Sequence, residues 1–430
     1  MNGVISRKPE LLAPAGDAAA LRAALDAGAD AVYFGAGSLN MRKRARNFQL
    51  GDISDVAAAC RESGAKAYLT VNTIVYENEL DDLERLLGMA VDAGVDAVIC
   101  WDDAVVHCAG DRNLDVHLST QASVSNSRSI IQRYRNNGVR RFVLARECSL
   151  DHIRMIQSRL REQLGDEAER IELEAFIHGA MCVSVSGRCF MSEAASGESG
   201  NRGACLQPCR RQYRIIDVEG EYEYELGRDY VMSPKDLCTM PFIEQVLESG
   251  IASLKIEGRM RSPEYVSVVT GAYRRAIDFW HDHVGDSVEP SAERSEFEIL
   301  KAELTEELRT VFNRGFSSGF YMGKPVGEWT KGANSQATRR KETVGVVVNY
   351  YRKVGIAEIR VQGASFGIGD ELVIQGPTTG NLVLNVESMQ VDHGEVKSAD
   401  KGMHVAVPVP RRVRVNDAVF RRFDITGVLS

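Results

Sequence analysis

Long apolar runs are missing from this 430-residue sequence. No stretch approaches the roughly 20 apolar residues that a membrane-spanning helix needs, and even AVICWDDAVV is interrupted at Asp102. The first residues, MNGVISRKPE, lack the apolar segment of a secretion signal. An excess of positive charge is also missing, since the formal net charge is -8. We therefore expect a cytoplasmic protein with no membrane or DNA partner, in which RNA binding would depend on a local basic patch.

Several enzyme signatures are absent as well. The sequence contains no H-E-x-x-H zinc-peptidase helix and no G-x-G-x-x-G after a predicted strand. One G-x-S-x-G match, Gly363–Gly367, lies between predicted β-strands and not at the strand-to-helix elbow of a nucleophilic serine. We interpret this match as a turn, and His281 with His283 as a weak candidate for a metal pair.

A repeated pattern organises the first 260 residues. An amphipathic stretch, a glycine and a short apolar run recur, as in DAGADAVYF and DAGVDAVIC. Such alternation predicts helices followed by parallel strands that are buried on both faces. The number and length of the runs favour a TIM-like (β/α)8 barrel, with an open doubly wound sheet as the alternative. The eight predicted strands are Glu10–Ala13, Ala31–Phe34, Ala67–Val71, Ala97–Cys100, Asp115–Ser119, Arg141–Leu144, Glu172–Ile177 and Ser253–Ile256.

Two departures from this pattern define the predicted domains. Between about residues 179 and 234 the alternation stops, which indicates an insertion that carries four cysteines and a hairpin. From about Thr343 the apolar residues alternate with period two between Gly, Asn and Asp turns. We therefore predict a barrel domain over residues 1–335 and a small C-terminal β-barrel domain over residues 340–430.

The cysteines of the insertion are the strongest chemical signal in the sequence. Cys182, Cys189, Cys205 and Cys209 lie in glycine-rich chain that can bury little apolar surface, and Cys238 follows them. A metal would supply the order that such a segment lacks. The close pair Cys205 and Cys209 would suit zinc, but Cys182 and Cys189 are too far apart for the usual zinc pattern. An iron–sulfur cluster tolerates wider spacing, so a cluster, a zinc ion and unmetallated thiols all remain open.

These segments resemble one known family. The blocks that carry the resemblance, in the same order as in the family, are ELLAPAGD, FGAGSLNMRKRARNF, HLSTQASVSN, EAFIHGAMCVSVSGRCFMSEAASGESGNRGACLQPCRRQY, SPKDL and SLKIEGRMRSPEY. The sequence is thereby identified as a member of the collagenase-like peptidase family U32, and it is most similar to the branch that hydroxylates tRNA. The resemblance spans essentially the whole chain.

The resemblance implies a specific activity. It implies an enzyme that hydroxylates the wobble uridine of tRNA to 5-hydroxyuridine without molecular oxygen, using a prephenate-dependent donor. It also implies an iron–sulfur cluster, of the four-iron, four-sulfur type, held by Cys182, Cys189, Cys205 and Cys209, with Cys238 as a substitute fourth ligand. The implied partners are tRNA or another structured RNA and a small anionic metabolite.

Further catalytic candidates follow from the barrel. Active sites of such barrels lie at the carboxyl ends of the strands, where His178, Lys255, Glu257 and Arg259 are predicted. Period-two alternation directs Lys255 and Glu257 into the lumen, where with Arg259 they could hold a carboxylate. A structural ion-pair network is the alternative for this group. His178 is a candidate metal ligand or proton donor, or a hydrogen-bonded histidine at a strand end.

Basic segments are the candidates for RNA contact. They are Arg42–Arg46, CRRQYR (Cys209–Arg214), PRRVRV and FRRF, with aromatic residues interleaved for stacking. Three other functions stay open beside tRNA hydroxylation: a peptidase, a ribosomal RNA hydroxylase, and a non-catalytic zinc protein that binds RNA. A peptidase would need an activated nucleophile, for which Cys182 with His178 is the nearest pair.

Overall fold

The structure is a computed structural model of the chain. It describes residues 8–42, 47–211, 213–216, 219–220, 223–226, 233–284, 292–323, 329–330 and 335–425. Within these ranges no helix is long and apolar enough to cross a membrane.

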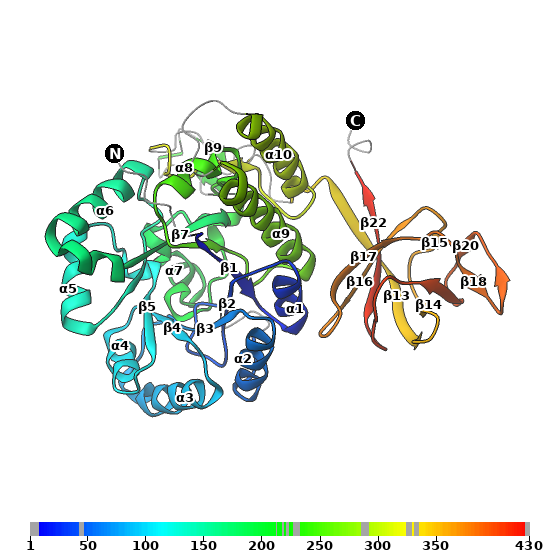
Figure 1. Cartoon of the computed structure of the whole chain (residues 1–430), viewed down its shortest axis with the longest axis horizontal. Helices are drawn as coiled ribbons and strands as arrows, with labels where there is room; N and C mark the ends of the chain where they lie inside the picture. Colours follow the sequence, from blue (N-terminus) through cyan, green and yellow to red (C-terminus); the bar gives the residue numbers. More distant parts are fainter. Residues whose placement is uncertain are drawn as a thin grey trace.

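Eight parallel strands form a closed barrel (Figure 1). Each strand pairs with the next along the chain, and the last one, β11, pairs with both β7 and β1. This double pairing confirms the TIM-like barrel and excludes the open sheet. The strands are β1 (Glu10–Ala15), β2 (Ala31–Phe34), β3 (Lys66–Val71), β4 (Ala97–Cys100), β5 (Asp115–Leu118), β6 (Arg141–Val143), β7 (Glu172–Gly179) and β11 (Ser253–Ile256).

Helices surround the barrel and bury the outer faces of the strands (Figure 1). Their ends follow local rules: the side chain of Asn126 caps the start of α5, and Gly138 ends it in the left-handed conformation (φ 67°) that glycine adopts without a Cβ clash. The helices are α1 (Ala18–Asp26), α2 (Ile53–Glu62), α3 (Leu80–Ala93), α4 (Asp103–Gly110), α5 (Ser127–Asn137), α6 (Leu150–Leu164), α8 (Ile243–Glu248), α9 (Pro263–Phe279) and α10 (Ala292–Arg309).

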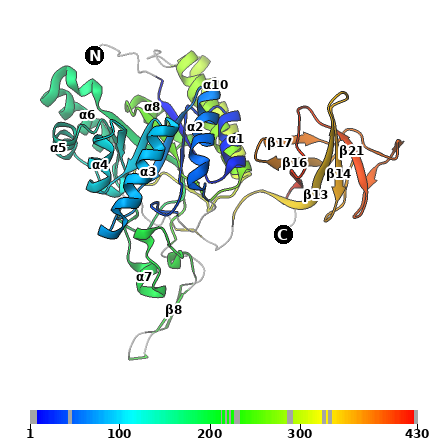
Figure 2. The ribbon, with the colours of Figure 1, turned by 90° about the horizontal axis from the view of Figure 1, so that it is seen from below.

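The predicted insertion separates β7 from β11. It contains the short helix α7 (Met191–Ser196) and the hairpin of β8 (Tyr213–Ile216) and β9 (Glu223–Leu226). Figure 2 shows α7 and β8 projecting from one end of the barrel. The insertion ends in β10 (Asp236–Cys238), which pairs antiparallel with the end of β7 and parallel with β12 (Phe316–Ser317).

A second apolar core lies in the C-terminal antiparallel sheets, and it contains Val347, Ile359, Leu372 and Val419. The main sheet has the order β17-β16-β22-β13-β14-β21-β18-β19, and β15 pairs with β20. The strands are β13 (Arg339–Tyr351), β14 (Ile356–Val361), β15 (Phe366–Gly367), β16 (Glu371–Gly376), β17 (Gly380–Asn385), β18 (Gln390–Val391), β19 (Gly394–Glu395), β20 (Ser398–Ala399), β21 (His404–Pro408) and β22 (Ala418–Asp424).

Candidate active site

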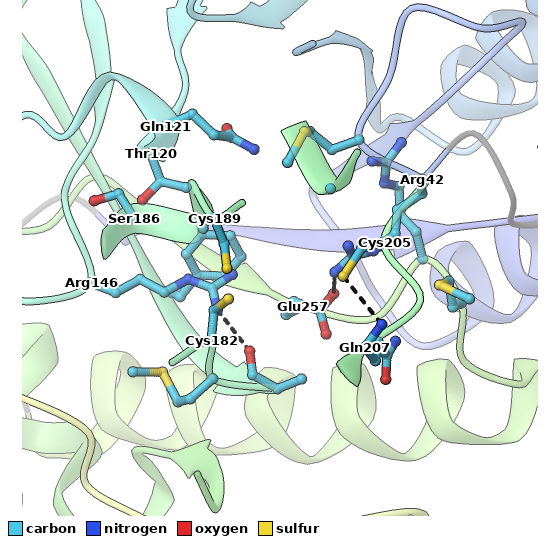
Figure 3. Close-up of a pocket in the computed structure, with 18 of the residues that line it drawn as sticks. Arg42, Thr120, Gln121, Arg146, Cys182, Ser186, Cys189, Cys205, Gln207 and Glu257 are labelled. Atoms are coloured by element: carbon cyan, nitrogen blue, oxygen red, sulfur yellow. Dashed lines mark hydrogen bonds and ion pairs between the residues drawn. The ribbon is translucent and has the colours of Figure 1, made fainter. Parts of the chain in front are cut away.

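A cavity of about 420 Å³ opens at the carboxyl ends of the barrel strands (Figure 3). One part of its wall follows directly after strands: Thr70 and Asn72 at β3, Gln121 after β5, Arg146 after β6 and Glu257 after β11. The insertion supplies the rest of the wall. The cavity therefore lies where barrel enzymes place their active sites.

The four cysteines of the insertion, which are Cys182, Cys189, Cys205 and Cys209, all line this cavity. The sulfur of Cys189 accepts a hydrogen bond from the backbone N–H of Met191 (3.3 Å), and that of Cys205 accepts one from Gln207 (3.4 Å). Burial raises the pKa of Cys209, Arg210 opposes the rise, and the charges of the other three cysteines add to it.

Hydrogen bonds from neighbouring loops fix the insertion above the barrel. Arg210 donates to Ser233 (2.5 Å) and to the backbone oxygen of Met181, and Arg202 pairs with Glu79 in the segment after β3. These arginines thus position the cysteine segment in addition to contributing positive charge. The sequence identifies the cysteines but not these anchors.

The donor set consists of thiols, which is the chemistry of an iron–sulfur site and also of a structural zinc site. Four thiols face one cavity, and thiolates are the usual ligands of iron–sulfur clusters. Within the described residues, no group of three or more His, Cys, Asp or Glu side chains is arranged to hold a metal ion. Cys238 does not line the cavity: it is 2 % exposed in β10, and its sulfur lies 3.9 Å from the Tyr273 hydroxyl. Of the two candidates for the fourth ligand, Cys209 lines the cavity and Cys238 does not.

Lys255 and Glu257 point into the lumen, as the alternation predicts, but each has a partner. The ammonium of Lys255 lies 2.7 Å from the Glu174 carboxylate, and Arg42 lies 3.1 Å from Glu257 (Figure 3). Burial lowers the pKa of Lys255, against the effect of Glu174. Burial would raise the pKa of Glu257, but the arginines around it, Arg42 foremost, lower it to about 2. Glu257 is thus a fixed anion and a poor proton acceptor at neutral pH.

Arg259 differs from these two residues because no carboxylate of a described residue pairs with it. Its guanidinium is 6 % exposed and donates to Thr70 Oγ1 (2.6 Å) and Asn40 Oδ1 (3.3 Å). Burial lowers its pKa to about 10. A Cβ at Gly35 would lie 2.5 Å from its Nη1 atom, so the missing side chain there makes room for the guanidinium. An uncompensated buried cation at the cavity wall is suited to bind an anion.

Arg146 is a cavity residue that the sequence analysis missed. It follows β6 by three residues, stacks on the ring of Phe176 at 4.0 Å and donates to the backbone oxygen of Ala180 (2.7 Å). Its position just after a predicted strand, where barrel enzymes place active-site residues, could have identified it from the sequence. With Arg42 and Arg259, it makes this end of the barrel strongly cationic.

His178 turns away from the cavity. The pairing of β7 with β11 shifts at this point, because Phe176 pairs with Lys255 but His178 pairs with Ile256. The irregularity places His178 on the helix side, 3.4 Å from the Tyr273 hydroxyl. The structure therefore favours the hydrogen-bonded histidine over the ligand or proton donor. Burial, with a smaller effect of Arg261, lowers its pKa to about 3.

This buried histidine predicts a stability profile. The folded pKa of His178 lies below the unfolded value of about 6.5, so only the unfolded chain binds the proton as the pH falls. The stabilisation is complete above pH 6.5 and is lost on acidification. In His178→Phe, we expect the fall in unfolding free energy between pH 6.5 and 5 to be shallower by about 1 kcal/mol per pH unit.

Urea denaturation at several pH values measures this difference. The same substitution at the exposed His107 is the control. An equal pH slope in wild type and His178→Phe would contradict the buried, neutral histidine.

Two of the predicted RNA-binding runs are held in ion pairs. Arg411 of PRRVRV pairs with Asp26 on α1 (2.7 Å), and Arg421 and Arg422 of FRRF pair with glutamates of neighbouring elements. In the run Arg42–Arg46, residues 43–46 lie outside the described residues, and Gln212 of CRRQYR does too. Arg411, Arg421 and Arg422 thus stabilise the fold and its contact with the barrel, whereas Arg412 and Arg414 of PRRVRV have no ion pair with a described residue.

Comparisons with known proteins agree with this architecture. The profile of Peptidase family U32 matches residues 16–331. The chain is 40% identical over 415 residues to a collagenase of Porphyromonas gingivalis (strain ATCC BAA-308 / W83), covering 96% of this chain and 97% of that protein. It is 36% identical over 397 residues to tRNA hydroxylation protein P1 of Bacillus subtilis (strain 168), covering 91% and 89%. It is 33% identical over 391 residues to a 23S rRNA 5-hydroxycytidine synthase of Escherichia coli (strain K12), covering 83% and 57%.

These relatives bear the names of enzymes, which confirms the prediction of an enzyme. The family match covers most of the barrel and its cysteine insertion. The chain therefore belongs to peptidase family U32.

Proposed function

We propose that this protein hydroxylates RNA. Relatives named for tRNA and for ribosomal RNA hydroxylation match it over most of its length, which supports this reaction class. Within the class, we propose the wobble uridine of tRNA as the substrate and 5-hydroxyuridine as the product, formed without molecular oxygen. Replacing the C5 hydrogen by hydroxyl is a two-electron oxidation, so a donor must supply the oxygen atom and accept the electrons; we propose prephenate or a compound derived from it.

One observation carries the proposal: four thiols and several cationic side chains line the same cavity at the carboxyl end of the barrel. Cys182, Cys189, Cys205 and Cys209 would hold a four-iron, four-sulfur cluster, which when bound would supply one-electron transfer or Lewis acidity. Arg210 holds the cysteine segment in place, and the backbone N–H groups of Met191 and Gln207 orient the sulfurs of Cys189 and Cys205 by donating to them.

The remaining residues of the cavity would bind the donor. Arg259 and Arg146, which have no carboxylate partner among the described residues, would each bind a carboxylate of the donor. Glu257 would orient Arg42 through their ion pair. Lys255 would keep the phenol of Tyr33 and the ring of Phe176 in place as the floor, because its ammonium lies over both rings.

Peptidase activity is the second candidate, favoured by the name of the collagenase relative. The described part of the cavity offers it no nucleophile with a base. The thiol of Cys182 forms a hydrogen bond with the hydroxyl of Ser184 (2.8 Å). His178 faces the helices, and no histidine lines the described cavity wall. Ser365, in the G-x-S-x-G match, hydrogen-bonds Asp400 in the β domain, far along the chain from the cavity residues.

Nucleoside analysis of RNA from a deletion strain tests the proposal. We expect 5-hydroxyuridine derivatives to disappear from tRNA and to return with the wild-type gene. Their retention in a strain with no redundant enzyme would overturn the tRNA assignment, and loss of hydroxycytidine from ribosomal RNA would move the substrate to the ribosome. Cleavage of denatured collagen by metal-free protein would instead support the peptidase.

A further inference from the structure

A second cavity, of about 380 Å³, lies where the β domain meets the barrel. The β domain supplies the consecutive cations Arg339–Lys341 at the start of β13, and the barrel supplies the ends of α9 and α10. Hydroxyl side chains of Ser262, Thr310 and Ser335 also line it. We name this cavity the seam groove.

The seam groove adjoins the cysteine-lined cavity. Phe312 lines both cavities, and its ring lies between two guanidinium groups, with Arg261 at 3.8 Å and Arg314 at 5.0 Å. Both arginines also line the first cavity. Arg314 pairs with Asp236 (3.2 Å), so Arg261 is the cation beside Phe312 that has no ion pair with a described residue on the route from the cavity to β13.

The groove carries positive charge that the protein does not neutralise. Its carboxylate, Glu264, already pairs with Lys341 (3.3 Å) and with Arg422 (3.1 Å). Arg339 pairs with Asp424 (2.7 Å). The side chain of the exposed Arg340, in contrast, has no ion pair or hydrogen bond with any described residue. Arg340 is thus free to bind an external anion.

We infer that the seam groove binds the phosphate backbone of the RNA strand beside the target nucleotide. This inference rests on the proposed function. A nucleotide whose base enters the cavity stays linked to its neighbours, so its backbone must leave along the surface, and the cationic route past Phe312 leads into the groove. Arginine and hydroxyl side chains are the usual phosphate contacts in nucleic-acid complexes, where they fix position without reading sequence.

Phosphate binding in the seam groove is tested by measuring the affinity of the full-length, anaerobically purified protein for an unmodified tRNA transcript at several salt concentrations. We expect Arg340→Glu to weaken binding about tenfold at 0.1 M salt, and Arg340→Ala to lower the slope of log Kd against log salt by about one, because one phosphate contact is lost. Thr310→Glu, on the barrel wall of the groove, should also weaken binding.

Arg352→Glu is the matched control. Arg352 is an exposed arginine just past the other end of β13, about 40 Å away for a strand of 13 residues. It brings the same charge change to the same domain outside the groove, so we expect less than about a twofold effect. Equal weakening by Arg340→Glu and Arg352→Glu, or an unchanged salt slope in Arg340→Ala, would overturn the inference.

The outcomes separate the groove from the proposed reaction. Groove-dependent tRNA binding without any loss of 5-hydroxyuridine in the deletion strain would leave the groove standing and overturn tRNA hydroxylation as the reaction. If Arg340→Glu binds tRNA normally and hydroxylates it normally, the proposed reaction stands and the groove is ruled out as an RNA-binding site.

Discussion

Cys205→Ser is expected to remove the iron and abolish hydroxylation. Serine oxygen is a poor substitute for thiolate in an iron–sulfur cluster, and Cys205 lies on the wall of the cavity with its sulfur already oriented by the N–H of Gln207. In anaerobically purified wild type, we expect about four irons per chain and a broad absorbance near 400 nm. In the variant, both should fall to background, and product formation should fall more than about a hundredfold.

Two other cysteines provide matched controls. Cys108 is half-buried outside the cavity and bonds Glu84, and Cys238 is buried behind the cavity wall. We expect Cys108→Ser and Cys238→Ser to keep their iron. Iron loss in Cys238→Ser, with iron retained in Cys209→Ser, would reverse the assignment of the fourth ligand. A colourless wild type that contains one zinc would contradict the cluster itself.

The barrel strands could be predicted because each one is specified locally. An apolar run of four or five residues after a glycine, such as AVIC after Gly94, needs no knowledge of distant chain. Closure could not be predicted in this way. It depends on the pairing of β7 with β11, and the whole cysteine insertion separates these strands in the sequence.

The candidate site was predictable where residue type alone carries the chemistry. The four clustered cysteines and the inward-facing Lys255 and Glu257 are such cases. Which cations have partners was not predictable, because pairing depends on contacts across the barrel. Lys255 meets Glu174 of β7, and Arg42 meets Glu257 from a loop more than two hundred positions earlier.

The surroundings of His178 and of the basic runs also depend on contacts that the sequence does not reveal. An irregular pairing at the end of β7 turns His178 outward, and no sequence periodicity announces a bulge. PRRVRV and FRRF look like polyanion sites, but Asp26 of the barrel pairs with Arg411 of the first run and Glu264 pairs with Arg422 of the second. Arg340 lies in the short run Arg339–Lys341, which was not among the predicted RNA-binding segments, and its side chain has no partner among the described residues.

The second large effect concerns Lys255, for which a structural and a ligand-binding role make different predictions. Lys255 is 4 % exposed and its ammonium lies 2.7 Å from the fully buried carboxylate of Glu174. Glu174→Gln leaves the ammonium without its counter-charge, so we expect the unfolding free energy to fall by about 3–5 kcal/mol. Urea denaturation at pH 7 measures the loss.

The double variant Glu174→Leu with Lys255→Met separates the two roles. Removing both charges avoids an unpaired buried ion, so we expect most of the lost stability to return. If Lys255 only stabilises the barrel, hydroxylation should return with the fold, because Arg259 and Arg146 still line the cavity. If Lys255 also binds the donor, the variant should fold and hold iron but show a raised KM for the donor. A double variant that is less stable than Glu174→Gln would contradict the pairing argument, because the loss would then come from packing and not from the isolated charge.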